Sequence, residues 1–290
     1  MDILFEIVEN KRIELAQAVN EMPLDVIKKL TEPKIAQDGA RKLRSMKRSL
    51  AKSPTGIIAE FKRKSPSKGW IHADADPVQV VTQYAQGGAS ASSILTDEKY
   101  FGGRLEFIQR VRQALSDIPE QGECRGKNLP LLRKEFIIDE YQLYEARLAG
   151  ADAVLLIAAA LHEAQYAELL KTAHALGLEV LLEVHAPEEL KFLQAGVPDM
   201  LGVNNRSLGT FHTDVQHSFD IASQMQRAVR SLGMLEDEAP LLVSESGIGN
   251  PSVVKLLREK GFRGFLIGEC FMKDEDPGES LKEFIREMNA

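Results

Sequence analysis

Eight short apolar runs recur along residues 57–267, and each is followed by a stretch with the spacing of an amphipathic helix. Short apolar runs bounded by turn residues are typical of strands buried on both faces, as in a parallel sheet. The runs are Ile57–Phe61, Ser92–Leu95, Leu129–Leu132, Ala153–Ile157, Val180–Glu183, Met200–Val203, Leu241–Val243 and Gly264–Ile267. The clearest helical patterns between them are Pro77–Gln86, Gln142–Leu148, His162–Leu176 and Pro251–Lys260. Eight such units in about 235 residues predict one closed (β/α)8 barrel, the TIM-barrel architecture of the α/β class.

The competing α/β architecture is a doubly wound open sheet. In that fold the first strand leads into a glycine-rich turn that binds a dinucleotide. Here the first strand leads instead into Glu60-Phe61-Lys62-Arg63-Lys64-Ser65-Pro66, which contains no glycine. The barrel is therefore the favoured architecture. The connection 207–239 is longer than an ordinary loop, so we expect it to contain a helix and a surface insertion.

Residues 1–56 precede the first strand and have the pattern of helices, with apolar residues at roughly helical spacing from Ile3 onward. Proline cannot donate a backbone hydrogen bond inside a helix, so we expect Pro23 to begin a second helix and Pro33 to end it. A third, strongly basic helix is expected over Lys42–Lys52. The predicted organisation is an N-terminal helical extension, residues 1–56, packed on a barrel of residues 57–290.

Charge and cysteine content exclude several classes of protein. The 36 basic and 43 acidic residues give a net charge of −7 and are spread along the chain. Nucleic acids and membrane surfaces require a concentrated basic face, so neither partner is expected. The lone Cys124 and Cys270 suit a reducing cytosol rather than a disulfide scaffold. No segment resembles a signal peptide or a membrane span, so we expect a cytoplasmic protein.

Polar residues follow or end most of the predicted strands. In a (β/α)8 barrel the carboxyl ends of the strands and the loops after them form the active site. These positions hold Glu60, Lys62, Lys134, Glu183, Asn204, Arg206, Glu245, Ser246 and Gly268. Glu60 and Lys62 are two residues apart, so both side chains should point to the same side of an extended strand. Two lysines and three carboxylates gathered at one end would suit proton transfer, because burial and opposite charges shift their pKa values.

The seventh and eighth predicted strands each lead into a glycine, Gly247 and Gly268. Barrels of this type often bind phosphate at these two strand ends through backbone N–H groups. Glycine lets the backbone approach the anion closely. The sequence therefore predicts an anionic, phosphate-bearing small molecule as the substrate.

The motifs at these strand ends resemble those of the indole-3-glycerol phosphate synthase family. The matching segments are IIAEFKRKSPSKG (57–69), SSILTDEKYFGG (92–103), LPLLRKEFIID (129–139), LLEVH (181–185), GVNNRSL (202–208), SESGI (244–248) and LIGECFM (266–272). They run in order through nearly the whole barrel, and the helical segment 1–52 is similar to the family's N-terminal extension, which lies over the barrel mouth.

The resemblance implies a carboxy-lyase of tryptophan biosynthesis. Such an enzyme converts 1-(2-carboxyphenylamino)-1-deoxyribulose 5-phosphate, a phosphosugar derivative, to indole-3-glycerol phosphate with loss of carbon dioxide and water. It implies no cofactor and no metal, and the six histidines form no H-E-x-x-H or similar pair. A monomer or weak homo-oligomer is expected.

Residue roles carry over by position. Lys134 resembles the general acid for ring closure, Glu183 the carboxylate of the later proton transfers, and Lys62, oriented by Glu60, a lysine that contacts the anionic groups. The expected catalytic residues are Glu60, Lys62, Lys134, Glu183, Asn204 and Ser246. Substrate contacts are expected from Ser65, Phe101, Phe136, Arg206, Leu208 and Glu245. The expected phosphate contacts are Lys62, Gly247, Gly268 and Glu269.

Three residues depart from the family pattern. Glu269 stands where a small residue is usual, so we expect its backbone N–H to reach the phosphate and its side chain to point away. Glu135 stands where the family more usually has an aspartate after the catalytic lysine. Ser207 stands where an aspartate or asparagine is usual after the arginine. The alternatives to a synthase are an inactive phosphosugar-binding barrel and another phosphate-binding barrel enzyme, such as phosphoribosylanthranilate isomerase.

Overall fold

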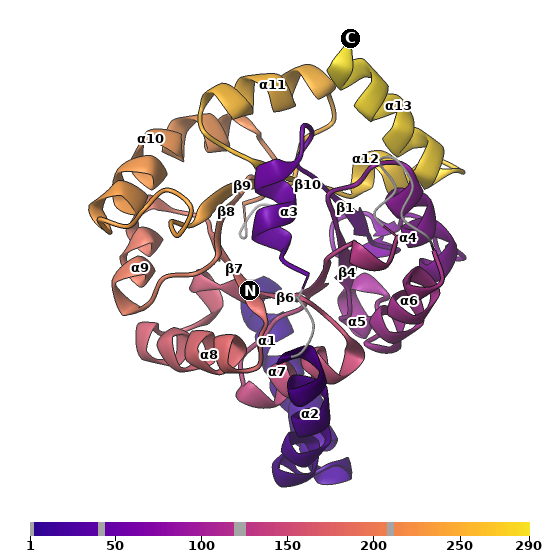
Figure 1. The fold of residues 1–290 in the computed structure, drawn as a ribbon, viewed down its shortest axis with the longest axis vertical. Helices are drawn as coiled ribbons and strands as arrows, with labels where there is room; N and C mark the ends of the chain where they lie inside the picture. The colour runs from indigo at the N-terminus through magenta and orange to yellow at the C-terminus, as the bar shows by residue number, and fades with distance from the viewer. Residues whose placement is uncertain (1–2, 40–43, 119–125, 208–211) are drawn as a thin grey trace.

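In the computed structural model, which describes residues 3–39, 44–118, 126–207 and 212–290, eight parallel strands close into a barrel (Figure 1). In order around the barrel they are β1 (Ile57–Phe61), β4 (Ala91–Leu95), β5 (Leu131–Lys134), β6 (Ala153–Ile157), β7 (Glu179–Val184), β8 (Met200–Asn204), β9 (Leu241–Glu245) and β10 (Gly264–Ile267). Pairing of β10 with β1, for example Phe265 with Ile57, closes the ring. The predicted (β/α)8 barrel is confirmed.

The bounds of β1, β6 and β10 are as predicted, whereas β5, β8 and β9 continue further into polar residues than their apolar runs indicate. Strand β5 begins after Pro130 and ends at Lys134, two residues later than predicted. Strands β8 and β9 extend to Asn204 and Glu245. The interior of the barrel is apolar toward the amino ends of the strands and polar at their carboxyl ends. The apolar pattern of a strand therefore stops before the strand itself ends.

Helices surround the barrel (Figure 1). They are α4 (Pro77–Gln86), α5 (Glu98–Phe101), α6 (Glu106–Ser116), α7 (Glu140–Ala149), α8 (Glu163–Ala175), α9 (Phe192–Ala195), α10 (Gln216–Ser231), α11 (Pro251–Glu259), α12 (Glu269–Met272) and α13 (Pro277–Asn289). Short 3-10 turns are η1 (Gly126–Asn128), η2 (Ala158–Ala160) and η3 (Pro187–Lys191), and β2 (Lys64–Ser65) pairs with β3 (Gly69–Trp70) in a small hairpin after β1. The predicted helix within 207–239 is α10.

Three helices, α1 (Ile3–Glu21), α2 (Leu24–Gly39) and α3 (Met46–Lys52), precede the barrel. The prediction that Pro33 ends the second helix is wrong, because Pro33 lies inside α2. Helix α2 packs along α7, where Lys28 pairs with Glu140 at 3.1 Å, and this packing outweighs the lost hydrogen bond. Figure 1 shows α2 projecting from the ring of helices. The third helix was predicted to begin at Lys42, which lies outside the described residues. At Arg44 and Ser45 the prediction is wrong, because Ser45 is extended and caps a helix that begins at Met46.

Helices α1 and α3 lie at opposite ends of the barrel. Met46 and Leu50 of α3 are fully buried against the interior side chains at the amino ends of the strands. Residues Ile3, Leu4 and Ile7 of α1 line a cavity at the carboxyl ends. Of the three helices that the structure describes in the extension, α1 is the one that lies over the mouth, and the domain boundary at residue 56 stays a prediction.

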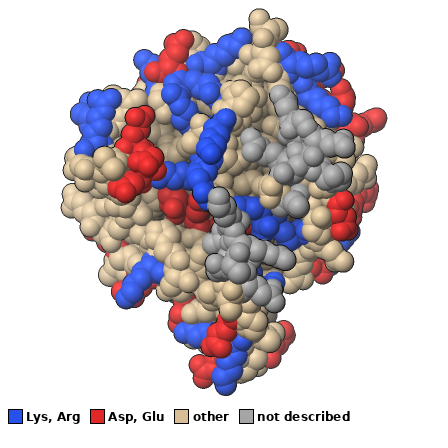
Figure 2. Space-filling view, in the orientation of Figure 1, with Lys and Arg blue, Asp and Glu red and all other residues tan. Residues whose placement is uncertain are grey.

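The face drawn in Figure 2 carries Lys and Arg side chains interspersed with Asp and Glu. Among the described residues, no helix has both the length and the apolar character needed to cross a membrane.

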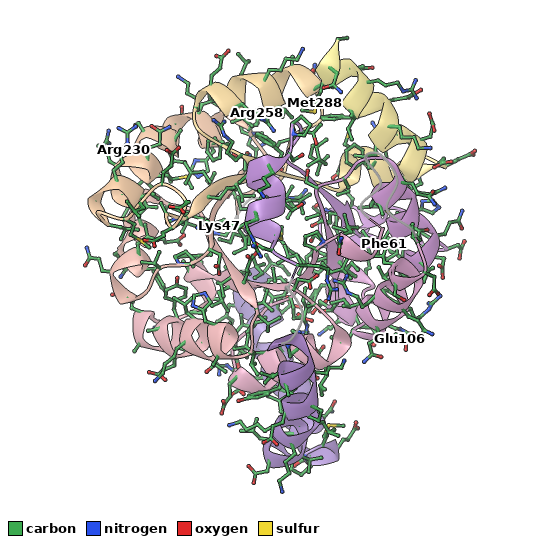
Figure 3. All side chains as sticks on the ribbon, viewed as in Figure 1. Lys47, Phe61, Glu106, Arg230, Arg258 and Met288 are labelled. Carbon is green, nitrogen blue, oxygen red and sulfur yellow. The ribbon has the colours of Figure 1, made fainter. Side chains whose placement is uncertain are left out.

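Alternation along β1 separates the core from the site. Phe61 points outward and packs edge-on against Phe107 of α6, with ring centroids 5.9 Å apart. Figure 3 shows Phe61 inside the ring of helices and Glu106 at its edge. Because successive side chains of a strand face opposite ways, this outward anchor turns Glu60 and Lys62 toward the barrel interior.

Candidate active site

Lysine and glutamate side chains meet inside the carboxyl end of the barrel. Lys134 Nζ of β5 donates to Glu183 Oε2 of β7 at 3.1 Å and also contacts Glu245 Oε2 of β9. Next to them, Lys62 Nζ lies 2.8 Å from Glu60 Oε1. The structure thus brings together the acid and base groups that the sequence placed on separate strands.

Two glycines, Gly202 within β8 and Gly268 directly after β10, make room for this cluster. A Cβ atom on Gly268 would lie 2.5 Å from Oε1 of Glu60. The carboxyl group of Glu245 covers Gly202 of β8 in the same way. Any larger residue at either position would push a carboxylate out of place, so these glycines serve the packing of the charged groups.

The cluster holds three carboxylates and two ammonium groups, all largely buried. Burial by itself lowers the pKa of Lys134, but the surrounding carboxylates, Glu245 first among them, raise it above its ordinary value. Burial raises the pKa of Glu245, although Lys134 opposes this shift. For Glu183, burial is outweighed by Lys134 and His185, which lower the pKa. One proton on Glu245 would therefore neutralise the cluster and leave Glu183 ionised as a base.

The backbone after β9 is strained. Ser246 has a φ of 69°, an unusual value for a residue with a side chain, and Gly247 follows with a φ of 76°. The buried Asn205 donates from Nδ2 to the Ser246 carbonyl at 3.0 Å and so holds this turn. Ser246 borders both cavities described next. Strain that the surroundings maintain in this way is concentrated at functional sites.

A polar cavity of about 430 Å³ opens at the ends of β1, β9 and β10. Gly247 and Gly268 contribute to its wall, and its cations are Lys62, Lys68, Arg206 and Lys273. Arg206 donates from Nη1 to Ser67 Oγ at 2.6 Å, which ties the loop after β1 across the cavity. Two backbone glycines beside several cations form a suitable site for a phosphate group.

Glu269 is placed differently from our expectation. Its side chain does not point away: it lines the polar cavity, contacts Lys68 Nζ and lies 3.7 Å from Arg206 Nη2. Burial alone would raise the pKa of Glu269, but the bond from Lys68 and the neighbouring cations lower it. The cations attract the carboxylate into the cavity, so it competes with an incoming anion for them.

An apolar cavity of about 130 Å³ adjoins the lysine–glutamate cluster. Phe101 and Phe136, whose ring centroids are 5.9 Å apart, line it together with residues of α1. Lys134, Glu183 and Asn204 border it, while Glu60, Lys62 and Arg206 border both cavities. Ser65 also lines it, and within the described part of the chain its buried Oγ has no hydrogen-bond partner. The predicted contact residue Leu208 lies outside the described residues.

Three residues near the site were missed from sequence. Ser67 lies within the quoted motif 57–69, but its contact with Arg206 joins distant loops. His185 Nε2 lies 3.3 Å from Glu183 Oε1 and directly follows the motif's apolar residues. Asn205 acts through the backbone of Ser246. No group of three His, Cys, Asp or Glu in the described ranges is arranged to hold a metal ion.

The structure has a closed parallel barrel and an acid–base cluster that borders both an apolar and a polar cavity. These features define the class: a (β/α)8-barrel enzyme acting on a phosphorylated small molecule. The family model for indole-3-glycerol phosphate synthase matches residues 4–284. This chain belongs to the indole-3-glycerol phosphate synthase family, whose members are carboxy-lyases.

Relatives of the same name support this membership. The chain is 50% identical to the indole-3-glycerol phosphate synthase of Bacteroides thetaiotaomicron over 288 residues, which is 98% of each chain. It is 39% identical to that of Carboxydothermus hydrogenoformans over 284 residues, 97% of this chain and 99% of the relative.

Solved structures show likeness in fold. Thiamine phosphate pyrophosphorylase from Pyrococcus furiosus matches with a TM-score of 0.57 at 15% identity, over 84% of this chain and 98% of that one. A tryptophan synthase α-subunit from the same organism matches with a TM-score of 0.54 at 16% identity, over 81% and 98%. At such identities the likeness concerns the barrel alone.

Proposed function

We propose that this chain performs the ring closure of tryptophan biosynthesis. It converts 1-(2-carboxyphenylamino)-1-deoxyribulose 5-phosphate to indole-3-glycerol phosphate, carbon dioxide and water. The observation that carries this proposal is the position of Lys134: its ammonium group borders the apolar cavity and contacts two buried carboxylates.

The two cavities suit the two ends of this substrate. The phosphate is proposed to bind in the polar cavity, where Lys62, Arg206 and the backbone of Gly247 and Gly268 are available. The carboxyphenyl ring would bind between Phe101, Phe136 and α1 in the apolar cavity. Ser65, whose Oγ is buried beside this cavity, would donate to the substrate carboxylate. The ribulose carbonyl then lies between the two ends, next to the lysine–glutamate cluster.

Ring closure needs an acid at that carbonyl. As the ring carbon that bears the carboxylate attacks the carbonyl carbon, the oxygen takes a proton, for which Lys134 is the proposed donor. The raised pKa keeps Lys134 protonated. The carbon–carboxylate bond then breaks, carbon dioxide leaves, and its electron pair restores the aromatic ring. An apolar wall around the carboxylate favours this loss, because it replaces water at the charged group.

Dehydration needs an acid and a base. The hydroxyl formed in the first step leaves as water after protonation, and the adjacent CH₂ group loses a proton to complete the indole. Glu183, whose pKa is lowered, is the proposed base, and Lys62, held by Glu60, is the proposed acid. Asn204, Ser246 and Glu245 are proposed to hold the reacting part of the substrate in position.

The test is product formation by the purified chain. Incubation with the carboxyphenylamino-deoxyribulose phosphate should give a rise in indole fluorescence, together with one carbon dioxide for each product molecule. Tight binding of the substrate without product would contradict the proposal and indicate an inactive phosphosugar-binding barrel.

A further inference from the structure

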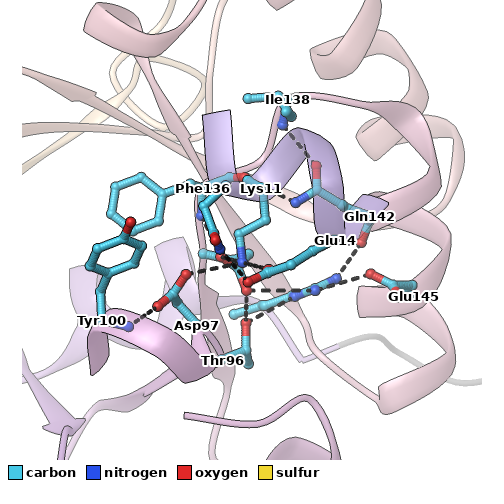
Figure 4. Close-up of polar contacts among 12 residues, drawn as sticks. Lys11, Glu14, Thr96, Asp97, Tyr100, Phe136, Ile138, Gln142 and Glu145 are labelled. Atoms are coloured by element: carbon cyan, nitrogen blue, oxygen red, sulfur yellow. Dashed lines mark hydrogen bonds and ion pairs between the residues drawn. The ribbon is translucent and has the colours of Figure 1, made fainter. Parts of the chain in front are cut away.

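A buried ion network joins α1 to the barrel next to the apolar cavity (Figure 4). Lys11 of α1 is only 5% exposed. Its Nζ lies 3.0 Å from Asp97 Oδ2 and 3.1 Å from Glu135 Oε1, and it donates to Glu14 Oε2 at 2.5 Å. A buried ammonium group is costly unless carboxylates pair with it, so this arrangement fixes Lys11 in one place.

The first carboxylate controls one wall of the cavity. Asp97 is fully buried and caps α5, since its Oδ1 accepts from the backbone N–H of Tyr100 at 2.8 Å. Phe101 is the last residue of that four-residue helix. A shift of Asp97 would therefore move the ring of Phe101.

The second carboxylate holds the segment that carries Phe136, the ring in contact with Phe101. Glu135 Oε1 accepts from the backbone N–H of Phe136 at 2.9 Å, and its Oε2 accepts from Thr96 Oγ1 at 2.7 Å. Burial alone would raise the pKa of Glu135, but Lys11 and Arg133 lower it, so it stays charged. Glu135 thus bridges Lys11 to the backbone that carries Phe136.

Lys11 also aligns its own helix. Ile7 and Lys11 are one helical turn apart, so they share a face of α1. On that face Ile7 and Leu4 line the apolar cavity. One ammonium group thereby connects three segments that line the cavity: α1, α5 with Phe101, and the segment with Phe136.

We propose that Lys11 is a positioning residue that sets the shape of the pocket for the aromatic end of the substrate. The inference deepens the proposed function and rests on its assignment of the apolar cavity. Lys11 does not line that cavity and acts through Asp97 and Glu135. Glu135, one of the departures from the family pattern, is thus one of the two carboxylates through which Lys11 acts.

The experiment compares the two ends of the substrate by titration calorimetry. The probes are 2-(methylamino)benzoate for the aromatic end and inorganic phosphate for the other. In Lys11→Met the Kd for the benzoate should rise at least about tenfold, as should KM for the full substrate, while the Kd for phosphate changes by less than about twofold. Lys11→Arg should recover most of the benzoate affinity.

A matched control is Lys28→Met, which removes another ion pair between the extension and the barrel, with Glu140, away from the cavity. It should leave both affinities unchanged. If Lys11→Met does not fold, Lys11→Met combined with Asp97→Asn removes one unpaired charge. The double variant should likewise show a raised Kd for the benzoate and little change in the Kd for phosphate.

Equal losses for both probes, or no loss for either, would overturn the proposal. So would a wild-type protein that does not bind the benzoate. Failure of the proposed function is distinguishable, because the wild type would then bind both probes and give no indole product.

Discussion

Lys134 and Glu245 are in contact although they come from opposite sides of the barrel. Lys134 ends β5, and Glu245 ends β9, the strand across the ring from it. Their side chains cross the interior, and Glu183 of β7 completes the group at 3.1 Å from Lys134. Because the two charged groups are buried together inside the barrel, their protonation state affects both the free energy of unfolding and the proposed proton transfers.

The first prediction concerns the proton on Glu245. Its pKa is raised in the folded protein, so above the ordinary value of 4.5 the folded protein binds more protons than the unfolded chain. The free energy of unfolding should therefore fall as the pH rises from about 5 to about 8. Glu245→Gln removes the titrating group, so the pH dependence should flatten in urea denaturation. Glu183, with a lowered pKa, contributes the opposite slope below its ordinary value. Parallel curves for the wild type and the variant would contradict the assignment.

The second prediction concerns the inward carboxylate of Glu269. Removing it in Glu269→Gln frees Lys68 and Arg206 for an anion. For a partly exposed ion pair worth ~0.5–1 kcal/mol, the affinity for inorganic phosphate should rise about two- to fivefold. The gain should shrink as salt is added, because screening weakens the competition. Weaker phosphate binding in the variant would mean that Glu269 orients the cations instead.

The third prediction concerns Gly268. In Gly268→Ala the new methyl group meets Glu60, with Oε1 at 2.5 Å and Cβ at 2.9 Å, and should displace that carboxylate from Lys62. Turnover should fall at least about tenfold. Gly249 is the matched control: it lines the same polar cavity, but a Cβ there has no neighbour within 4 Å. Gly249→Ala should keep turnover near that of the wild type, and equal effects of the two substitutions would contradict this reading.

The architecture was predictable because apolar runs report burial on both faces. The runs located all eight strands, and the residues at their ends included the cluster. The ends of β5, β8 and β9 were placed too early, since Lys134, Asn204 and Glu245 belong to the strands but not to the apolar pattern. That Glu245 meets Lys134 follows from barrel closure, which no local pattern contains.

Other features depend on contacts between distant segments. Pro33 remains inside α2 because α7 supports that helix. Glu269 turns inward because Lys68 and Arg206, from two other loops, attract it. In the sequence, nothing distinguishes Lys11 from an ordinary surface lysine. It is buried because α1 packs on the barrel, where Asp97 and Glu135 pair with it.

The most direct test of the central claim is Lys134→Met, which keeps the aliphatic stem and removes the proposed acid. Turnover of the carboxyphenylamino-deoxyribulose phosphate should fall by about 10²–10⁴. The Kd for inorganic phosphate should change little, because Lys134 does not line the polar cavity. Turnover within a few-fold of the wild type would contradict the role of Lys134 as the acid of ring closure.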